Sequence, residues 1–349
     1  MEFKRIFRSS RPPKRNPQGR SDSSTAKAVR RKEDLVDTAK ETLHILKRVL
    51  RELRTEDKAH RSIKYSFTTL TRLDPNDCPA YPEPATIKVT NEDTLNAAIR
   101  LAQIGAHDRR LRNLRPAIVN FANYRTPGGG WLNGDIAQEE AICYRSSLAL
   151  SLNRKHYPLA MDEELYSPYV VIVRDDMASG HRLLPPSVLA TDLPVVSALT
   201  VAAIHQPEVR TFVLKNNDGG DVFGFGPQPR KKRVFAHDKD RSITKAKMRL
   251  ALRIAATNGH GLLVFGALGC GVYANPPEDV AHCWLEVLKE DEFSGNWWRQ
   301  VCFAVYGSNK ADNYHIFHRV LHDKRVQNDR EEGSGKMAAL VFCENVLTM

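Results

Sequence analysis

Apolar and polar positions follow two different patterns along this chain. Between residues 33 and 53, Leu, Val and Ala recur every three or four positions, which predicts a helix with one apolar stripe. Short continuous apolar runs, such as Ala117–Phe121 and Leu262–Phe265, predict strands that are buried on both faces. Helices that alternate with buried strands are typical of an α/β protein.

The same criteria predict an alternating series of elements over most of the chain. We expect strands near residues 86–89, 117–121, 169–174, 194–201, 262–265 and 301–306. We expect helices near residues 33–53, 93–103, 136–152, 243–258, 277–289 and 311–321, the second capped by Thr90 or Asn91. This order predicts a three-layer α/β/α fold around a mixed, largely parallel sheet, whose ligands bind beyond the carboxyl ends of the strands.

Two glycine-rich loops each follow one of these strands. The first loop holds Gly128–Gly130, where the missing Cβ atoms allow a ligand to lie directly against the backbone. The second loop, 266–271, follows the strand at 262–265, and its exposed N–H groups predict a cradle for phosphate. We expect both loops at the same edge of the sheet, beside a single ligand.

Glu139 and Glu140 stand in the first turn of the helix that follows the first loop. The helix dipole explains one carboxylate there, and Asp135 with Gln138 resembles a capping arrangement. Consecutive helix residues point about 100° apart, so the two carboxyls cannot flank a sugar as a glycosidase pair does. One carboxyl would then act twice, as acid and later as base, which suits a ribosyl centre.

The charge of the 349-residue chain is concentrated at its start. The net charge is +11, but residues 1–33 hold eleven Lys or Arg against three Asp or Glu, a net charge of +8, which leaves +3 for the rest. We expect residues 1–32 to form a disordered basic tail, either solvated, or a nuclear-import patch, or a mitochondrial leader. We expect no membrane association and no sequence-specific nucleic-acid binding.

The six cysteines form no Cys-x-x-Cys pair, which argues against a zinc site. Their scattered positions indicate reduced thiols and an intracellular protein, in the nucleus, the cytoplasm or both. Cys270 lies inside the second loop, which offers no His as a base, so we expect it to fill space.

Two segments interrupt the α/β pattern. Residues 215–241 read as a long basic loop, either a variable surface insertion or a rail for a polyanionic substrate. Residues 323–349 read as a C-terminal tail. We therefore expect one catalytic domain over 33–322, with a helical extension at 33–85.

The first loop and its helix carry a specific motif. Gly128-Gly129-Gly130, seven residues, and then Gln138-Glu139-Glu140 resembles the signature of poly(ADP-ribose) glycohydrolases, in the bacterial-type branch that also occurs in fungi. The chain looks like a fungal member, and the similarity spans roughly residues 33–317. Supporting matches are Ala39–Leu43, Asn91–Leu95, Asn120–Ala122, Pro127–Trp131, Arg145–Ser147 and Gly269–Asn275.

The resemblance implies a macrodomain-like fold and exo-type hydrolysis of ribose–ribose O-glycosidic bonds, releasing ADP-ribose. By position, Glu140 would be the acid and base, and Glu139 would hold the ribose hydroxyls. The residues that would bind the rest of the substrate are Gln138, Asn120, Asn123, Gly128, Gly129, Gly130, Gly269, Cys270, Gly271, Val272 and Tyr273. Family members often carry Phe where Tyr273 stands. The chemistry requires no metal and no cofactor, and the expected partners are poly(ADP-ribose) and ADP-ribosylated proteins, bound by a monomer.

Two other functions fit the same residues. One is a macrodomain-like reader that binds ADP-ribose without turnover, although the intact Glu139–Glu140 pair argues against it. The other is a hydrolase of mono(ADP-ribosyl) proteins.

Overall fold

The computed structural model describes residues 18–107, 115–214, 230–307 and 313–327. Its centre is a seven-stranded sheet of order β1-β4-β5-β3-β8-β9-β2. The strands from β5 to β2 run parallel to one another. At the other edge, β4 runs antiparallel to β5, and β1 runs antiparallel to β4. The sheet strands are β1 (Ile63–Ser66), β2 (Ile87–Thr90), β3 (Ala117–Phe121), β4 (Glu163–Val171), β5 (Val195–Val201), β8 (Leu262–Phe265) and β9 (Gln300–Ala304). A separate antiparallel hairpin joins β6 (Val209–Leu214) to β7 (Arg230–Phe235).

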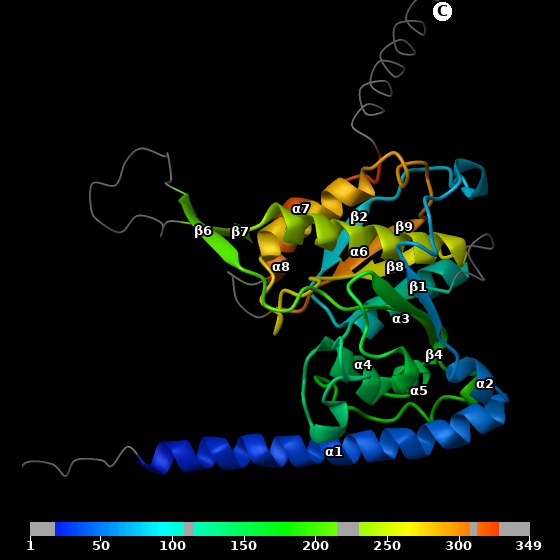
Figure 1. The fold of residues 1–349 in the computed structure, drawn as a ribbon. Coiled ribbons are helices and arrows are strands. Elements are labelled where there is room, and N and C mark those ends of the chain that lie inside the picture. Colours follow the sequence, from blue (N-terminus) through cyan, green and yellow to red (C-terminus); the bar gives the residue numbers. More distant parts are fainter. Residues whose placement is uncertain (1–17, 108–114, 215–229, 308–312, 328–349) are drawn as a thin grey trace, which may run out of the picture.

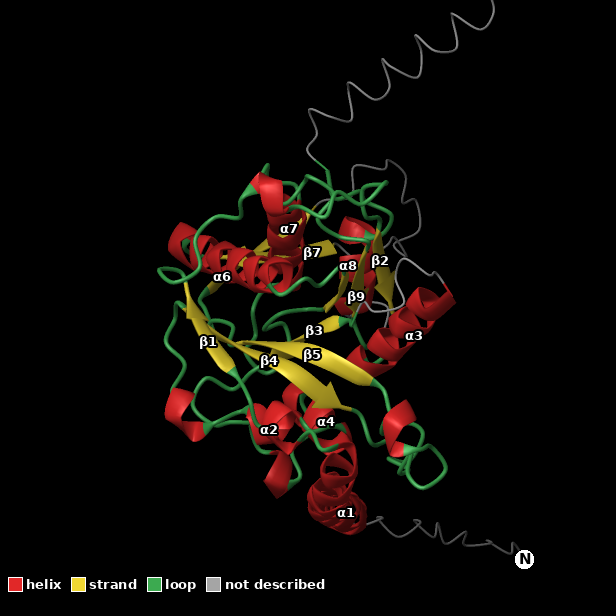
Figure 2. Ribbon diagram, turned by 90° about the vertical axis from the view of Figure 1, so that its right-hand side faces the viewer, coloured by secondary structure: helices red, strands yellow, loops and turns green. Residues whose placement is uncertain are grey.

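Helices cover both faces of the sheet (Figures 1 and 2). One face carries α6 (Asp238–Thr257), α7 (Pro277–Leu288) and α8 (Asn313–Leu321). The other face carries α1 (Gln18–Leu53), α3 (Thr94–His107), α4 (Gln138–Arg145) and α5 (Leu148–Ser151), and the short α2 (Glu56–Ala59) follows α1.

Two hydrophobic cores explain why the central strands are apolar throughout. Ile118 packs into the core beneath α3 and α4, whereas its neighbour Val119 packs into the core beneath α6 and α7. Leu263 and Val264 divide in the same way between the two cores. Successive strand residues point to opposite faces, so a strand covered on both sides is apolar at every position. The predicted three-layer α/β/α fold is confirmed.

Several predicted boundaries differ from the structure. Helix α1 begins at Gln18, so residues 18–32 are helical where the sequence predicted a tail. Strand β4 begins at Glu163, ahead of the predicted start at 169, and β1 was not predicted. Asp93 caps α3, since its Oδ1 accepts the backbone N–H of Leu95 at 2.7 Å, in place of Thr90 or Asn91.

The helix predicted over 136–152 is interrupted. Helix α4 ends at Arg145, and Ser146 takes an extended conformation with φ −147° and ψ 175°. Ser146 pairs with Ile172 beside the sheet, which turns the chain before α5 begins. Asp135 does not cap α4, because the cap residue is Ala137 and makes no side-chain hydrogen bond.

The predicted basic loop over 215–241 is shorter in the structure. Its last residues form strand β7 and the start of α6, while residues 215–229 lie outside the described part. The predicted tail also begins later than residue 323. Val326 is buried and donates its backbone N–H to Ala85 at 2.9 Å, so the chain remains attached to the domain there. Residues 337–347 lie outside the described part.

Candidate active site

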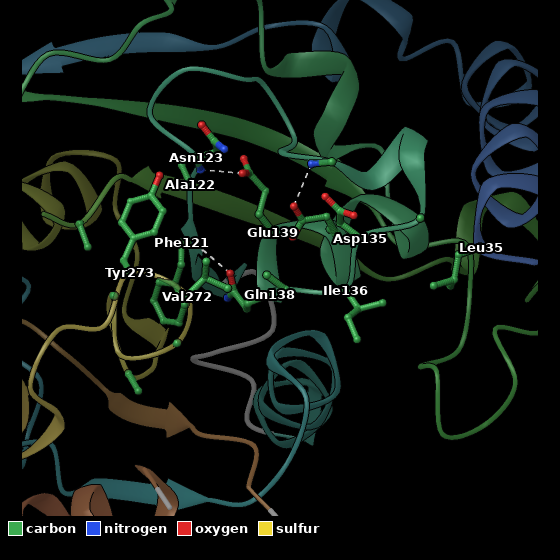
Figure 3. Close-up of a pocket in the computed structure, with 18 of the residues that line it drawn as sticks. Leu35, Phe121, Ala122, Asn123, Asp135, Ile136, Gln138, Glu139, Val272 and Tyr273 are labelled. Atoms are coloured by element: carbon green, nitrogen blue, oxygen red, sulfur yellow. Dashed lines mark hydrogen bonds between the residues drawn. The ribbon is translucent and has the colours of Figure 1, made fainter. Parts of the chain in front are cut away.

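The two glycine-rich loops meet at one edge of the sheet, as the sequence predicted. Strands β3 and β8 are parallel neighbours, paired through Ile118 and Val264, so the loops that follow them leave the sheet side by side. A cavity of about 860 Å³ lies between them (Figure 3). Its lining is Arg31, Lys32, Leu35, Phe121, Ala122, Asn123, Gly130, Gly134, Asp135, Ile136, Ala137, Gln138, Glu139, Glu140, Ala203, Ala267, Gly269, Gly271, Val272 and Tyr273.

Three N–H groups hold the carboxyl of Glu139 against the first loop. The Asn120 side-chain amide and the Gly128 backbone N–H each donate to Oε1 at 3.2 Å. The backbone N–H of Asn123 donates to Oε2 at 2.7 Å (Figure 3). The pKa of Glu139 is raised to about 8, chiefly by burial; the neighbouring Glu140 adds to this rise and the three donors oppose it.

Glu140 is held by one oxygen only. The backbone N–H of Gly130 donates to its Oε1 at 2.9 Å. Its Oε2 is buried and finds no hydrogen-bond partner among the residues that the structure describes. Because a buried polar atom is rarely left without a partner, this oxygen is a candidate contact for a molecule bound in the cavity.

The side chain of Gln138 fixes where α4 starts. Its Oε1 accepts the backbone N–H of Phe121 at 2.8 Å, and its Nε2 donates to the carbonyl of Val119 at 2.8 Å. The same Nε2 donates to Thr94 Oγ1 at 3.1 Å. Gln138 thereby joins α4 to the end of β3 and to α3, which sets the direction of the two glutamates that follow.

The absence of a Cβ at Gly129 makes room for the glutamates. Its φ is +59°, and an added Cβ would lie 2.1 Å from Glu140 Oε1 and 3.3 Å from Glu139 Oε2. Only glycine adopts this conformation without strain and allows both carboxyls to approach.

The second loop presents free backbone N–H groups to the cavity. Within the described part of the chain, no acceptor takes the N–H of Gly271, Val272 or Tyr273. The side chain of Asn275 shapes this turn by donating to the carbonyls of Ile204, Gly269 and Tyr273, at 2.7, 3.3 and 3.1 Å. Such a turn suits a phosphate group.

Tyr273 reaches across from the second loop to the first. Its hydroxyl accepts the backbone N–H of Tyr124 at 3.3 Å, and its ring packs edge-on against His205. The aromatic face therefore closes one side of the cavity beside Asn123 and Val272 (Figure 3).

Four of the predicted site residues do not line the cavity. Asn120, Gly128 and Gly129 lie behind the two glutamates and support them from there. Cys270 is turned into the protein, where burial raises the pKa of its thiol, in keeping with a space-filling role.

Sequence reasoning missed the contribution of α1. Arg31, Lys32 and Leu35 line the outer end of the cavity, and Lys32 Nζ lies 3.4 Å from Asp135 Oδ1. They lie about a hundred residues before the loop that they contact. The sequence pattern of α1 shows only an apolar stripe, which predicts a packed helix and does not indicate a functional site.

Among the described residues, no cluster of three His, Cys, Asp or Glu side chains is arranged to hold a metal ion. Within the same ranges, no helix combines the length and apolarity that crossing a bilayer requires.

The three-layer α/β fold is consistent with a macrodomain-like protein, and its cavity brings together a glycine-rich turn and two adjacent buried carboxyls. Residues 39–175 match the model of the family "Microbial-type PARG, catalytic domain", where PARG is poly(ADP-ribose) glycohydrolase. This match contains the first glycine-rich loop and both glutamates, in agreement with the resemblance to the microbial branch. No curated protein sequence matches the chain.

Solved structures of bacterial PARGs are also similar to this chain. The poly(ADP-ribose) glycohydrolase from Thermomonospora curvata is 26% identical, with a TM-score of 0.60, over 82% of this chain and 99% of that one. A second structure of that enzyme, bound to the inhibitor ADP-HPD, has a TM-score of 0.57 at the same identity and coverage. The enzyme from Deinococcus radiodurans, in complex with ADP-ribose, is 26% identical, with a TM-score of 0.55, over 76% of this chain and 95% of that one.

Proposed function

We propose that this protein is a poly(ADP-ribose) glycohydrolase that hydrolyses the ribose–ribose O-glycosidic bonds of the polymer and releases ADP-ribose from the chain end. The observation that carries the proposal is the carboxyl of Glu140, which lines the cavity and keeps Oε2 buried without a partner. The family match over residues 39–175 and the likeness to PARG structures support the same activity.

Binding would use both loops. The free N–H groups of Gly271, Val272 and Tyr273 would hold the diphosphate. A carboxylate has about four acceptor positions, and the neighbouring N–H groups use three of those on Glu139. The remaining position would accept a hydroxyl of the ribose at the scissile bond.

Glu140 would perform the chemistry in two steps. Its Oε2 first donates a proton to the oxygen that links the two riboses, so that the bond to the anomeric carbon breaks and an oxocarbenium-like centre forms. The carboxylate then takes a proton from the water that attacks this carbon, which restores the acid. The hydrogen bond from Gly130 keeps Oε1 in place through both steps.

The first step requires a proton in the site at neutral pH. Burial raises the pKa of Glu139 to about 8, so the pair of carboxyls retains a proton in that range. Three N–H donors oppose the rise on Glu139, but burial outweighs them. The pair of carboxyls therefore keeps one proton available for the leaving oxygen.

The test is incubation with purified poly(ADP-ribose). We expect free ADP-ribose to appear, and we expect Glu140→Gln to remove this activity while ADP-ribose binding stays within about threefold of the wild-type value. Tight polymer binding without product from the wild-type protein would instead identify a reader. Release of ADP-ribose from mono(ADP-ribosyl) proteins alone would identify the other hydrolase.

Several wider expectations accompany this activity. We propose one catalytic domain over about residues 33–322, acting as a monomer on the polymer attached to ADP-ribosylated proteins, without a cofactor. We further propose a nuclear or cytoplasmic enzyme, with a mitochondrial address as the alternative for its basic N-terminus. That the chain is a fungal member of the microbial branch stays a prediction.

A further inference from the structure

The β6–β7 hairpin stands away from the body of the protein (Figure 1). It forms a two-stranded sheet of its own, separate from the central sheet. Phe212 of β6 lies opposite Lys232 of β7, and Arg210 lies opposite Val234. Because side chains alternate between the faces of a strand, these four residues share one face of the hairpin.

This face combines an exposed aromatic ring with cations. Phe212 is 51% exposed, although a large apolar side chain gains free energy from burial. Arg210 is also exposed, and Lys232 is half-buried beside them. An exposed ring flanked by cations is the arrangement on which nucleic-acid bases stack while phosphates are neutralised.

The cations of the hairpin lack the ion pairs that neutralise those of the nearby helices. On α6, Arg241, Lys245 and Arg249 pair with carboxylates of α7 and the residues after it. By contrast, no carboxylate in the described ranges pairs with Lys232 or Arg233. The positive charge of the hairpin is therefore available to an anionic partner.

The base of the hairpin is fixed to the candidate active site. The backbone N–H of Gln206, just before β6, donates to the carbonyl of Tyr273 at 2.9 Å. At the other strand, the N–H of Phe235 donates to Asp279 of α7 at 3.0 Å. The hairpin thus extends from the Tyr273 side of the cavity.

We propose that the β6–β7 hairpin is a second binding surface for poly(ADP-ribose), which holds ADP-ribose units next to the one in the cavity. This inference rests on the proposed function. An adenine would stack on Phe212, and diphosphates would contact Arg210 and Lys232 on the same face. We favour this polymer over other polyanions because the surface is joined to a cavity whose loops suit a single ADP-ribose unit.

The test measures the binding of poly(ADP-ribose) and of free ADP-ribose separately, in the full chain. Every protein carries Glu140→Gln, so that the polymer stays intact. The variants are Phe212→Ala and the double substitution Arg210→Glu with Lys232→Glu, both on the proposed face. Matched controls are Val213→Ala, which removes the neighbouring exposed side chain from the opposite face, and Lys47→Glu with Lys58→Glu, which makes the same change of charge elsewhere.

We expect Phe212→Ala to weaken the affinity for polymer of about twenty units roughly tenfold, as for the loss of one stacked base. We expect the Arg210/Lys232 double variant to lower the slope of log affinity against log salt by about 0.7 for each lost phosphate contact. Affinity for free ADP-ribose should not change, and the two controls should leave polymer binding within about twofold.

Three results would overturn the inference. The first is an equal loss of polymer affinity in the variants and their controls. The second is a parallel loss of affinity for free ADP-ribose, which would make the hairpin part of the cavity. The third is displacement of the polymer by single-stranded RNA at equal phosphate concentration, which would indicate a general nucleic-acid surface. Failure of the wild-type chain to release ADP-ribose would refute the proposed function separately, because binding is measured without turnover.

Discussion

The backbone N–H of Gly130 lies 2.9 Å from Oε1 of Glu140 and donates a hydrogen bond to it. Helix α4 fixes the position of the Glu140 backbone, and the hydrogen bond from the preceding loop fixes the orientation of its carboxyl group. The backbone of the glycine-rich loop therefore positions the Glu140 carboxyl directly.

Gly129→Ala should remove most of the activity with a small change in stability. The added Cβ would lie 2.1 Å from Glu140 Oε1, so the carboxyl must move. Displacing a reacting group by about 1 Å costs on the order of a hundredfold in rate. The kcat/KM for ADP-ribose release from polymer measures this effect.

Gly180→Ala is the control for this substitution. Gly180 has φ +85°, and no atom lies within 4 Å of an added Cβ. Alanine at this position therefore causes similar backbone strain but displaces no side chain. We expect it to lower thermal stability less than Gly129→Ala does, because it displaces no buried group, and to retain full activity. Equal activity in the two variants would show that Glu140 tolerates the movement.

Tyr273→Phe should retain kcat/KM within about threefold, whereas Tyr273→Ala should raise KM at least about tenfold. The hydroxyl makes one neutral hydrogen bond, to the N–H of Tyr124 at 3.3 Å, and such a bond contributes only about 1 kcal/mol. The ring forms a wall of the cavity, and its loss opens that side. A large KM effect in the Phe variant would assign the substrate contact to the hydroxyl instead.

The order of strands and helices could be read from the sequence because of local signals. Ala117–Phe121 and Leu262–Phe265 are strands with the predicted bounds, since burial on both faces leaves a continuous apolar run. The break in the helix at Ser146 had no such signal, because pairing with Ile172 on a distant strand causes it. Local propensity cannot report an interaction that forms only in the folded chain.

The candidate site was predictable to a similar degree. The glycines and glutamates lie within thirteen residues of one another, so their spacing in the sequence already indicated a shared site. Lys32 and Leu35 reach the cavity only because α1 packs across the loop at Gly134. The unpaired carboxyl oxygen of Glu140 likewise depends on tertiary burial, and no pattern of residues specifies it.

Gln138→Met should lower stability more than it lowers the affinity for ADP-ribose. Both polar groups of Gln138 already bond to the protein, so the variant leaves the Phe121 N–H and the Val119 carbonyl without partners. An unsatisfied buried group costs about 1–3 kcal/mol, which denaturant unfolding detects. We expect calorimetry of the folded variant to show an ADP-ribose affinity within about threefold of the wild-type value.

Gln138→Glu tests separately the hydrogen bond that Gln138 accepts and the one that it donates. Its carboxylate can still accept from the Phe121 N–H, but its second oxygen would face the Val119 carbonyl, so we expect a comparable loss of stability. An affinity loss above tenfold with unchanged stability in either variant would instead make Gln138 a direct substrate contact.

The buried carboxyl of Glu139 should make folding stability fall as the pH rises. Its pKa is raised from the ordinary 4.5 to about 8, chiefly by burial. Between these two values the unfolded chain has lost this proton and the folded chain keeps it, so the folded state binds more protons and stability decreases with pH. Above about pH 8 both states are ionised, and this contribution becomes constant.

Melting temperatures of the wild-type protein and of Glu139→Gln from pH 5 to pH 9 isolate this contribution, because other titrating groups are common to both proteins. The amide cannot titrate, but its NH₂ group faces either the N–H of Asn123 or those of Asn120 and Gly128, which lowers stability at every pH. We therefore expect the gap between the two melting curves to narrow steadily up to about pH 8 and then to stay constant. The kcat/KM of the wild-type enzyme should fall above the same pH, since the first step consumes the proton that the carboxyl pair retains. A gap that is constant from pH 5 to pH 8 would mean that Glu139 is ionised throughout, and the proton for the leaving group would then need another source.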